Sequence, residues 1–536
     1  MQKILFNFTI IISILFIQGC ESEVLVSELG LVPLPSSVSI QKGTADFSAD
    51  WSINHNDGHP DLKHLKERLA ENIQTDHGIS LSKSSKQNIS LNISENSTTD
   101  DSEDYELSIR TDEIIINASS PNGVFYGIQT LLQLLDSGKR AANKIEIQKV
   151  SIRDIPRFQW RGMHLDVGRH FFDVTFVKRY IDYLAMHKMN VFHWHLTEDQ
   201  GWRVEIDAYP KLTEISAYRD ESLIGHYSDK PHQWDGNKYG GYYTKEEMSD
   251  VVAYAQKQYI TVVPEIEMPG HTRAVLAAYP ELSCTGGPHT VAKLWGVHKE
   301  VFCAGKESTF EFLETVLTEV AEIFPSPYIH IGGDECPKDR WKEHDLDQQR
   351  IVAEGLHDEH ELQSYFIKRI EGILNGLGKR MIGWDEILEG GLAPGAIVQS
   401  WRGMDGGIAA ANAGHEVIMS PTSHAYFDYY QSENKDNEPL AIGGLLSLEK
   451  VYGFEPVPAE IDKDKEHFIL GGQGNVWTEY ISTPEKAEYM AIPRMSAMAE
   501  VLWSQAKDRD YESFTSRMEW QYKRLDRMKI NYRKPD

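Results

Sequence analysis

The chain has 536 residues, of which 41% are hydrophobic and 25% are charged, and its formal net charge is -27. These proportions are ordinary for a globular protein, and a chain of this length forms large cores in more than one domain. The acidic balance argues against nucleic acid as a partner, because phosphate binding needs a basic face.

The N-terminus is expected to be a lipoprotein signal peptide over residues 1–20. Lys3 precedes an apolar run over residues 4–17, which is too short for a comfortable membrane span and fits a signal segment. Cys20 follows where the run stops, as in a bacterial lipobox. We expect lipidation of Cys20, export to the periplasm or cell surface, and membrane contact only through this anchor. An ordinary secretory signal with an incidental cysteine is the alternative. Residues 21–31 are expected to form a tether.

Residues 32–155 are expected to form a smaller accessory α/β domain. Residues 105–109 alternate between polar and apolar side chains and, with residues 114–117, predict a hairpin. The apolar pattern after Pro121 predicts a helix. Residues 83–104 are rich in Asn, Ser and Asp, which predicts a loop.

After residue 156, short apolar runs alternate with helical patterns up to the end of the chain. Eight such runs with intervening helices predict a (β/α)₈ barrel over residues 156–536. The predicted strands are Gly162–Val167, Val191–Leu196, Ile260–Ile266, Tyr328–Ile331, Arg380–Trp384, Ala396–Trp401, Glu416–Ser420 and Phe468–Gly472. Because barrel enzymes carry their chemistry at the C-terminal ends of the strands, the functional residues are expected there.

The end of the fourth predicted strand has the strongest signal of a site. Gly332 and Gly333 follow an apolar run, and Asp334 and Glu335 come directly after them. Glycine accepts backbone angles that other residues resist and allows a ligand to approach closely. The alternative is a solvated acidic loop, but the bend and the apolar lead-in favour a site.

Tryptophan lies at or shortly after the ends of three other predicted strands. Trp384, Trp401 and Trp477 each lie within two residues of a charged residue. A single Trp is more often part of a core, but three at barrel strand ends indicate a carbohydrate pocket, because sugar rings pack their apolar faces on aromatic walls.

His193 and His195 at the second strand end allow a metal-binding interpretation. We favour histidines bonded to carboxylates, with Asp166, Glu198 and Glu267 as available partners, because no matching set of further ligands follows on later strands. Elsewhere, Cys284 and Cys303 flank a Gly-rich loop, and export makes a disulfide between them possible.

Several segments together resemble glycoside hydrolase family 20, the β-N-acetylhexosaminidases. The resemblance extends in order over the barrel and into the preceding domain. It rests on residues 123–131 (GVFYGIQTL), 161–170 (RGMHLDVGRH), 194–202 (WHLTEDQGW), 268–271 (MPGH), 330–335 (HIGGDE) and 474–479 (GNVWTE).

The resemblance implies removal of terminal, non-reducing β-linked GlcNAc or GalNAc from a glycan or chitooligosaccharide, with retention of configuration. In this family the 2-acetamido oxygen of the substrate is the nucleophile, and it gives an oxazolinium intermediate. The resemblance implies that Glu335 is the general acid and base and that Asp334 orients the acetamido group. An ionised Asp334 is then expected to raise the pKa of Glu335. No metal or organic cofactor is implied.

The remaining roles follow from the matching positions. Arg169 is expected to bind hydroxyls of the sugar ring, and Tyr426 is expected to donate a hydrogen bond to the acetamido oxygen. His271 is expected to pair with Glu198 and to support the acid Glu335. Many family members have Asp where Glu198 stands. The residues expected to line the pocket or bind outer hydroxyls are Trp384, Trp401, Trp477, Asp428 and Glu479. The alternatives are a non-catalytic sugar-binding lipoprotein on the same scaffold and, third, a metal-dependent barrel hydrolase.

Overall fold

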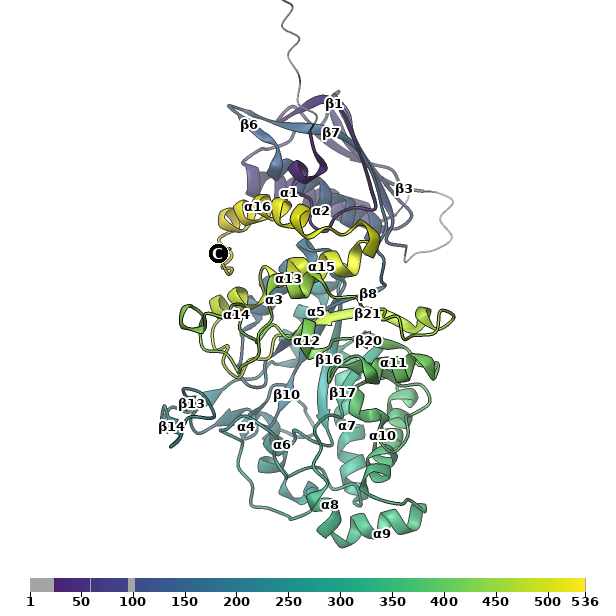
Figure 1. Ribbon diagram of the computed structural model, residues 1–536, viewed down its shortest axis with the longest axis vertical. Coiled ribbons are helices and arrows are strands. Elements are labelled where there is room, and N and C mark those ends of the chain that lie inside the picture. Colours follow the sequence, from purple (N-terminus) through teal and green to yellow (C-terminus); the bar gives the residue numbers. More distant parts are fainter. Residues whose placement is uncertain (1–23, 58, 95–101, 536) are drawn as a thin grey trace, which may run out of the picture.

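The computed structural model describes residues 24–57, 59–94 and 102–535. A sheet domain caps one end of a barrel domain (Figure 1). The predicted signal peptide and Cys20 lie outside the described residues. Within the described part of the chain, no helix has the length and apolar character needed to cross a membrane.

The accessory domain is a seven-stranded sheet in the order β1-β7-β4-β5-β3-β2, with β6 paired to β7. Two long helices, α1 (Asp61–His77) and α2 (Pro121–Ser137), accompany it. The strands are β1 (Ser37–Ser48), β2 (Ser52–His55), β3 (Asn88–Ile93), β4 (Tyr105–Ile109), β5 (Glu113–Ala118), β6 (Lys139–Ala141) and β7 (Lys144–Asp154).

The predicted hairpin and helix of this domain are both present. Strands β4 and β5 pair antiparallel, with Ile109 opposite Ile114. Helix α2 begins after Ser120, whose hydroxyl accepts a hydrogen bond from the backbone N–H of Gly123. Such an N-cap satisfies a donor that the helix itself leaves free. Nearly every residue of α2 is buried, so this helix forms the centre of the domain's core.

Two local expectations for this region are wrong. The predicted loop over residues 83–104 contains β3, in which Ile89, Leu91 and Ile93 alternate with more exposed residues and face the core. The expected tether is packed against the protein in its second half, because Leu31 is buried and its carbonyl accepts a hydrogen bond from Arg517.

The barrel is closed, and all eight of its strands are parallel. Every predicted barrel strand is confirmed, with ends that differ by no more than about two residues. The strands are β8 (Trp160–Asp166), β9 (Val191–His195), β16 (Thr261–Met268), β17 (Tyr328–Gly332), β18 (Arg380–Trp384), β19 (Ile397–Ser400), β20 (Val417–Met419) and β21 (Ile469–Gly474).

Helices cover most of the outside of the barrel. The connection from β18 to β19 departs from this pattern and has only a 3₁₀ turn, η3 (Asp385–Leu388). The main helices are α3 (Val174–Met186), α5 (Lys245–Gln256), α7 (Glu307–Ile323), α10 (Glu359–Gly376), α11 (Asp405–Asn412), α13 (Leu448–Tyr452), α14 (Pro484–Ala491), α15 (Arg494–Trp503) and α16 (Tyr511–Met528).

Short elements fill the loops at the C-terminal ends of the strands and between helices. The strands are β10 (Thr197–Glu198), β11 (Gly201–Trp202), β12 (Tyr218–Arg219), β13 (Leu223–Ile224), β14 (Gln233–Trp234) and β15 (Tyr239–Gly240). The helices are α4 (Lys211–Glu214), α6 (Arg273–Ala278), α8 (Asp339–Glu343), α9 (Asp345–Glu354) and α12 (Thr422–Ala425).

A buried ion pair joins the two domains. The Nζ of Lys188, at the end of α3, lies 3.0 Å from Oδ2 of Asp154, at the end of β7, and both side chains are fully buried. Tyr105 donates to the same oxygen and Trp503 donates to the other one. A buried charge is tolerated only when it is paired and hydrogen-bonded. This contact therefore fixes the sheet domain to the end of the barrel at which the strands begin.

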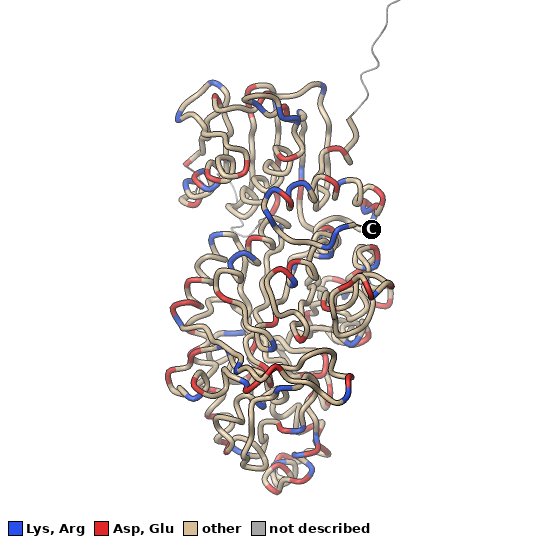
Figure 2. The backbone as a smooth tube through the Cα atoms, turned by 90° about the vertical axis from the view of Figure 1, so that its left-hand side faces the viewer, with Lys and Arg blue, Asp and Glu red and all other residues tan. Residues whose placement is uncertain are grey.

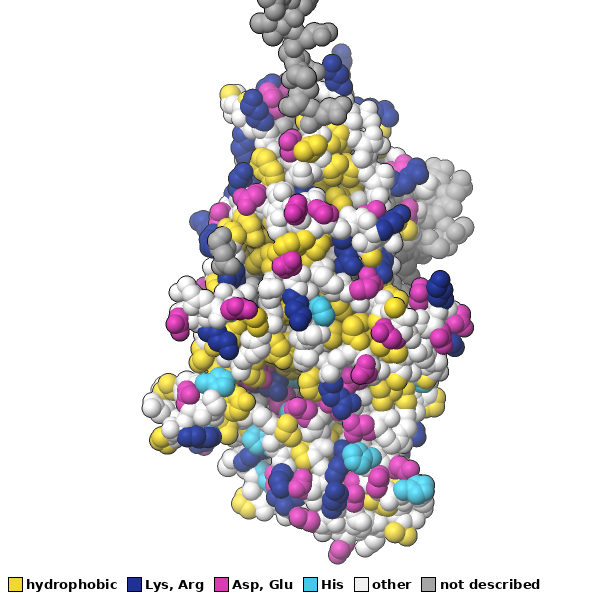
Figure 3. All heavy atoms as spheres, in the orientation of Figure 1, with side chains coloured by type: hydrophobic (Ala, Val, Ile, Leu, Met, Phe, Trp, Pro, Cys, Tyr) yellow, Lys and Arg dark blue, Asp and Glu magenta, His cyan; other side chains and the backbone are white. Residues whose placement is uncertain are grey.

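Charged residues of both signs are interspersed over both domains (Figure 2). On the face shown in Figure 3, the basic side chains do not gather into one large patch. This distribution gives a polyanion no extended basic surface on that face, in keeping with the net charge of -27.

Candidate active site

A cavity of about 380 Å³ lies at the C-terminal ends of the barrel strands. Ten of the residues singled out from the sequence line it: Arg169, His271, Asp334, Glu335, Trp384, Trp401, Tyr426, Asp428, Trp477 and Glu479. Glu198 lies behind the wall and contacts two of these residues. Sequence reasoning missed Tyr227, Trp295 and Val297, which come from loops far in the chain from the end of any barrel strand and also line the cavity.

The chain turns sharply where β17 ends, as the paired glycines predicted. Gly332 has φ of 67° and Gly333 has φ of 90°. A Cβ on Gly332 would lie 1.8 Å from Oε2 of Glu267, so no other residue fits there without a rearrangement. Glu335 itself has φ of 44°, a conformation that costs a non-glycine residue energy and that is enriched at active sites. The bend sends the two carboxylates into different surroundings.

Aromatic rings form the wall of the cavity opposite these acids. Trp384 and Trp477 lie with ring centroids 5.7 Å apart, and Tyr426 contacts Trp477 at 6.2 Å and Trp401 at 6.1 Å. Glu265 accepts the indole N–H of Trp384 at 2.8 Å, which fixes that ring. The predicted convergence of the three tryptophans is therefore confirmed.

Arg169 is held rigidly at the edge of the cavity. One guanidinium nitrogen lies 3.0 Å from Oε2 of Glu198 and another lies 3.5 Å from Oδ2 of Asp166. Its Cζ is 5.1 Å from the ring centroid of Trp477, at cation–π distance. The Nε of Arg169 is buried and has no hydrogen-bond partner, so a donor remains free for a ligand.

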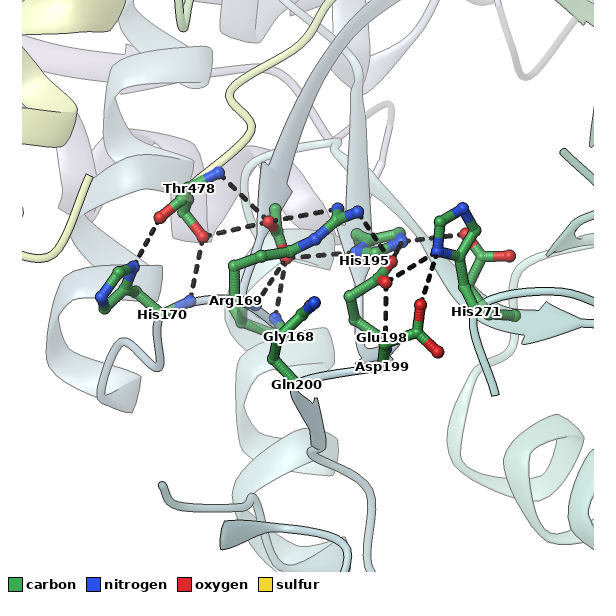
Figure 4. A network of polar contacts seen from close by, with 12 residues as sticks. Gly168, Arg169, His170, His195, Glu198, Asp199, Gln200, His271 and Thr478 are labelled. Carbon is green, nitrogen blue, oxygen red and sulfur yellow. Dashed lines mark hydrogen bonds and ion pairs between the residues drawn. The ribbon is translucent and has the colours of Figure 1, made fainter. Parts of the chain in front are cut away.

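His271 contacts Glu198 and Asp199 on one side (Figure 4) and the two candidate catalytic acids on the other. Its Nδ1 lies 2.9 Å from Oε1 of Glu198 and 3.1 Å from Oδ2 of Asp199, and its Nε2 lies 3.4 Å from Oε2 of Glu335. The longer side chain of Glu198 therefore reaches both His271 and Arg169, and the expected pair is formed. Asp199 was missed as a partner, although it stands directly after Glu198 in the chain.

The histidines of β9 are bonded to carboxylates. His195 lies 3.2 Å from Asp166 and 3.1 Å from Glu267, and His193 lies 2.9 Å from Glu265. Two of the three carboxylates named from the sequence are thus close partners of His195, while Glu198 is farther away at 3.8 Å. These buried pairs of imidazoles and carboxyl groups lie beneath the cavity, where Glu265 also holds the Trp384 ring of the wall.

The pKa values of the two candidate catalytic acids are shifted in opposite directions. Burial, followed by the charge of Glu267, raises the pKa of Asp334 well above its usual range. The hydrogen bond from His271 lowers the pKa of Glu335 and outweighs burial, which acts the other way. The expectation that Asp334 raises the pKa of Glu335 is therefore wrong for the ligand-free protein, because His271 lies closer to Glu335 and dominates its surroundings.

His271 can exert this effect because it is itself held in the charged form. Burial opposes the charge, but Glu198, Asp199 and Glu335 together raise the pKa of His271 well above its usual range. Of the two acids, Asp334 therefore holds a proton more readily than Glu335 in the ligand-free protein.

Two further carboxyl groups lie on the other side of the cavity. Burial and the neighbouring Glu479 raise the pKa of Asp428 well above its usual range, and burial also raises the pKa of Glu479. Oδ1 of Asp428 is buried without a hydrogen-bond partner. Both groups are placed as expected, and the free oxygen indicates that a polar ligand completes the site.

The possible disulfide is not formed in the structure, where Cys284 and Cys303 are free thiols. Their Sγ atoms lie 3.3 Å and 3.2 Å from the same carboxylate oxygen of Asp347. The spacing of the cysteines does not reveal that a buried acid from a later helix contacts both sulfurs.

Both domains match a known protein family. Residues 158–506 match the model for the catalytic domain of glycosyl hydrolase family 20, and residues 28–155 match the model for domain 2 of that family. The chain is 50% identical to a beta-hexosaminidase of Porphyromonas gingivalis over 80% of its length and spans only 54% of that relative. It is 35% identical to a beta-hexosaminidase of Vibrio furnissii over 87% of its length and 72% of the relative.

Solved structures agree with this assignment over almost the whole chain. A GH20 exo-β-N-acetylglucosaminidase from Vibrio harveyi in complex with N-acetylglucosamine superposes with a TM-score of 0.82 at 35% identity, and the match covers 96% of this chain and 80% of the other. A Streptomyces plicatus β-hexosaminidase mutant in complex with GlcNAc gives 0.81 at 29% identity, covering 95% and 97%. The chain belongs to glycosyl hydrolase family 20.

Proposed function

We propose that this protein is an exo-acting β-N-acetylhexosaminidase that removes terminal, non-reducing β-linked GlcNAc or GalNAc with retention of configuration. A glycan or chitooligosaccharide is the substrate class. The observation that carries the proposal is the position of Asp334 and Glu335, side by side on a bent strand end, at a cavity walled by Trp384, Trp401 and Trp477. The relatives named β-hexosaminidases and the structures with bound GlcNAc support it.

Free polar groups in the cavity match a sugar with several hydroxyls. Arg169 Nε, Trp477 Nε1, Asp334 Oδ1 and Asp428 Oδ1 are buried without hydrogen-bond partners. Buried polar atoms normally have partners, so these atoms are available to a ligand that brings donors and acceptors of its own. The aromatic wall binds the apolar face of the ring, while Arg169, Asp428 and Glu479 bind its hydroxyls.

The first step uses the substrate's acetamido group as the nucleophile. Its N–H donates a hydrogen bond to Asp334, which favours the ionised carboxylate, while Tyr426 donates to the acetamido oxygen. That oxygen attacks the anomeric carbon as the glycosidic bond breaks, and Glu335 gives its proton to the departing oxygen. The product is an oxazolinium ion whose positive charge is stabilised by Asp334.

The second step reverses the role of Glu335. The carboxylate takes a proton from water, and the hydroxide equivalent attacks the anomeric carbon from the side that the leaving group vacated. The ring of the intermediate opens, the acetamido group is restored, and Glu335 is protonated again. Two inversions at one carbon give net retention.

Substrate binding must therefore move one proton within the acid pair. In the ligand-free protein the raised pKa of Asp334 and the lowered pKa of Glu335 favour protonation of Asp334 over Glu335. The acetamido N–H stabilises the anionic form of Asp334, and the sugar displaces water from Glu335. Both changes favour transfer of the proton from Asp334 to Glu335. Glu335 is then protonated and can act as the general acid when the substrate is bound.

Replacing Glu335 by Gln tests the proposal. The amide cannot transfer a proton, so kcat on a substrate with a poor leaving group is expected to fall by ~10²–10⁴-fold. Binding of GlcNAc, measured by calorimetry, is expected to change little. Glu322→Gln on the exposed face of α7 is the matched control and keeps full activity. Near-normal turnover by Glu335→Gln would contradict the assignment, and a wild-type protein that binds GlcNAc but cleaves nothing would establish the sugar-binding alternative.

Replacing His271 by Asn tests the electrostatic part of the account. The hydrogen bond from His271 is the largest cause of the low pKa of Glu335, so its loss raises that pKa. The acid then stays protonated to higher pH, and the high-pH limb of the kcat/KM profile is expected to move upward. The control is His360→Asn, at an exposed histidine paired with Glu389. A profile that falls in height without moving on the pH axis would contradict this role.

We further propose that the protein is an exported bacterial lipoprotein anchored through Cys20 and acting on glycan or chitin fragments outside the cytoplasm. The proposal rests on the apolar run over residues 4–17 and the cysteine that follows it. In the native host, Cys20→Ser is expected to release the protein from the membrane fraction, whereas the control Cys336→Ser, at a buried thiol, stays with it. Equal membrane association of Cys20→Ser and wild type would refute the anchor.

A further inference from the structure

Four side chains capable of binding a metal meet at one point outside the sugar pocket. Cys284 follows the 3₁₀ turn η2 (Pro280–Leu282), and Cys303 lies shortly before α7. His344 ends α8, and Asp347 lies in the first turn of α9. Helices α8 and α9 are at the end of the molecule opposite the accessory domain (Figure 1). Cys284, Cys303, His344 and Asp347 are called the CCHD cluster below.

The spacing of the ligand atoms suits a tetrahedral metal ion. The four atoms all lie within 4.8 Å of one another. Oδ2 of Asp347 is 3.3 Å and 3.2 Å from the two sulfurs, and Nδ1 of His344 is 3.3 Å from the Sγ of Cys303. Zinc bonds of about 2.3 Å to sulfur and about 2.0–2.1 Å to nitrogen or oxygen give edges of about 3.3–3.8 Å in a tetrahedron. Most of the observed separations are already close to these values.

The surroundings hold the carboxylate in place for such an ion. Asp347 is completely buried, and its Oδ1 accepts a hydrogen bond from the backbone N–H of Gly305 at 2.6 Å. The other oxygen is thereby turned toward the cluster. Metal ligands are commonly fixed in this way by a hydrogen bond from outside the site.

The cluster has acceptors and thiols but no fixed positive charge. Among the described residues, the only ion pair of Asp347 is with His344, at 2.7 Å. Both sulfurs instead contact the carboxylate of Asp347. A divalent cation reverses this situation, because it binds the thiolates directly and compensates the buried carboxylate.

A disulfide between Cys284 and Cys303 is the alternative to metal binding. It would use both sulfurs and leave His344 and Asp347 as an ordinary pair. It gives no reason for a buried acid and an imidazole to converge on the same two sulfurs, whereas a four-ligand metal site needs all four groups. A closed set of four protein ligands is also the pattern of structural zinc.

We propose that the CCHD cluster binds one structural Zn²⁺ ion when its cysteines are reduced. The ion would fasten the loop over residues 285–302 to the segment that contains α8 and α9. That loop carries Trp295 and Val297 of the cavity wall, and α8 follows directly after Asp334 and Glu335. Zinc would thus fix the mouth of the sugar pocket relative to its acids without contacting the substrate.

Metal content of the reduced protein tests the site. The full chain, purified under reducing and anaerobic conditions, is incubated with ZnCl₂ and separated from free metal by gel filtration. Wild type is expected to retain about one zinc per chain. His344→Ala and Cys303→Ser are expected to lose most of it. Cys336→Ser is the matched control, since Cys336 is also a buried free cysteine but lies outside the cluster, and it should retain the ion.

Two further measurements, one of absorption and one of melting temperature, test the site independently of Cys303→Ser, in case that variant folds poorly. Cobalt(II) bound to wild type should show thiolate-to-metal charge-transfer absorption, which weakens in His344→Ala. Zinc should raise the melting temperature of wild type but not of His344→Ala, whose side chain is partly exposed. Reduced wild type that retains no zinc, or His344→Ala that retains as much as wild type, would overturn the proposal.

Discussion

The site depends on holding two adjacent carboxyl groups in different electrostatic environments. Neighbouring acids repel, and the chain separates them by a left-handed bend at Gly332 and Gly333 that continues into Glu335. Asp334 is turned inward toward Glu267, and burial favours its neutral form. Glu335 is turned toward His271, whose charge favours the anion. The strain of this turn is sustained by the rigid barrel around it.

The charge on His271 is in turn maintained by the residues behind it. Glu198 and Asp199 hold one side of the imidazole, and Glu198 also holds Arg169 at the opposite edge of the cavity. One carboxylate thus connects the part of the site that handles protons to the part that binds hydroxyls. Beneath them, Asp166, His195 and Glu267 form a buried layer with little freedom to move. Polar groups that are oriented before the substrate binds need little reorganisation during the reaction, which is where much of electrostatic catalysis originates.

Much of this could be predicted from sequence, because periodicity and strand-end chemistry are local signals. All eight barrel strands and the residues at their ends follow from such patterns. Strand β3 was missed because its run of alternating apolar residues is short and lies within a strongly polar segment. Asp199 and Glu265 were missed because their roles depend on contacts with residues more than 70 positions away, such as His271 and Trp384.

The direction of the pKa shifts was not accessible from sequence either. Which acid keeps the proton depends on the distance from each carboxyl group to His271 and on burial, and adjacency in the chain determines neither. The Cys284–Cys303 pair shows the same limit: a disulfide follows from spacing and export, whereas the convergence with Asp347 requires the fold.

The most direct measurement of the central claim compares aryl β-glycosides that differ only at the 2-position. In a series with acetamido, monofluoro-, difluoro- and trifluoroacetamido groups, kcat/KM is expected to fall at each step, because fluorine withdraws electrons from the attacking oxygen. The corresponding plain glucoside should be essentially uncleaved. Equal rates across the series, or efficient cleavage of the glucoside, would contradict the account, because either result would require a nucleophile supplied by the protein.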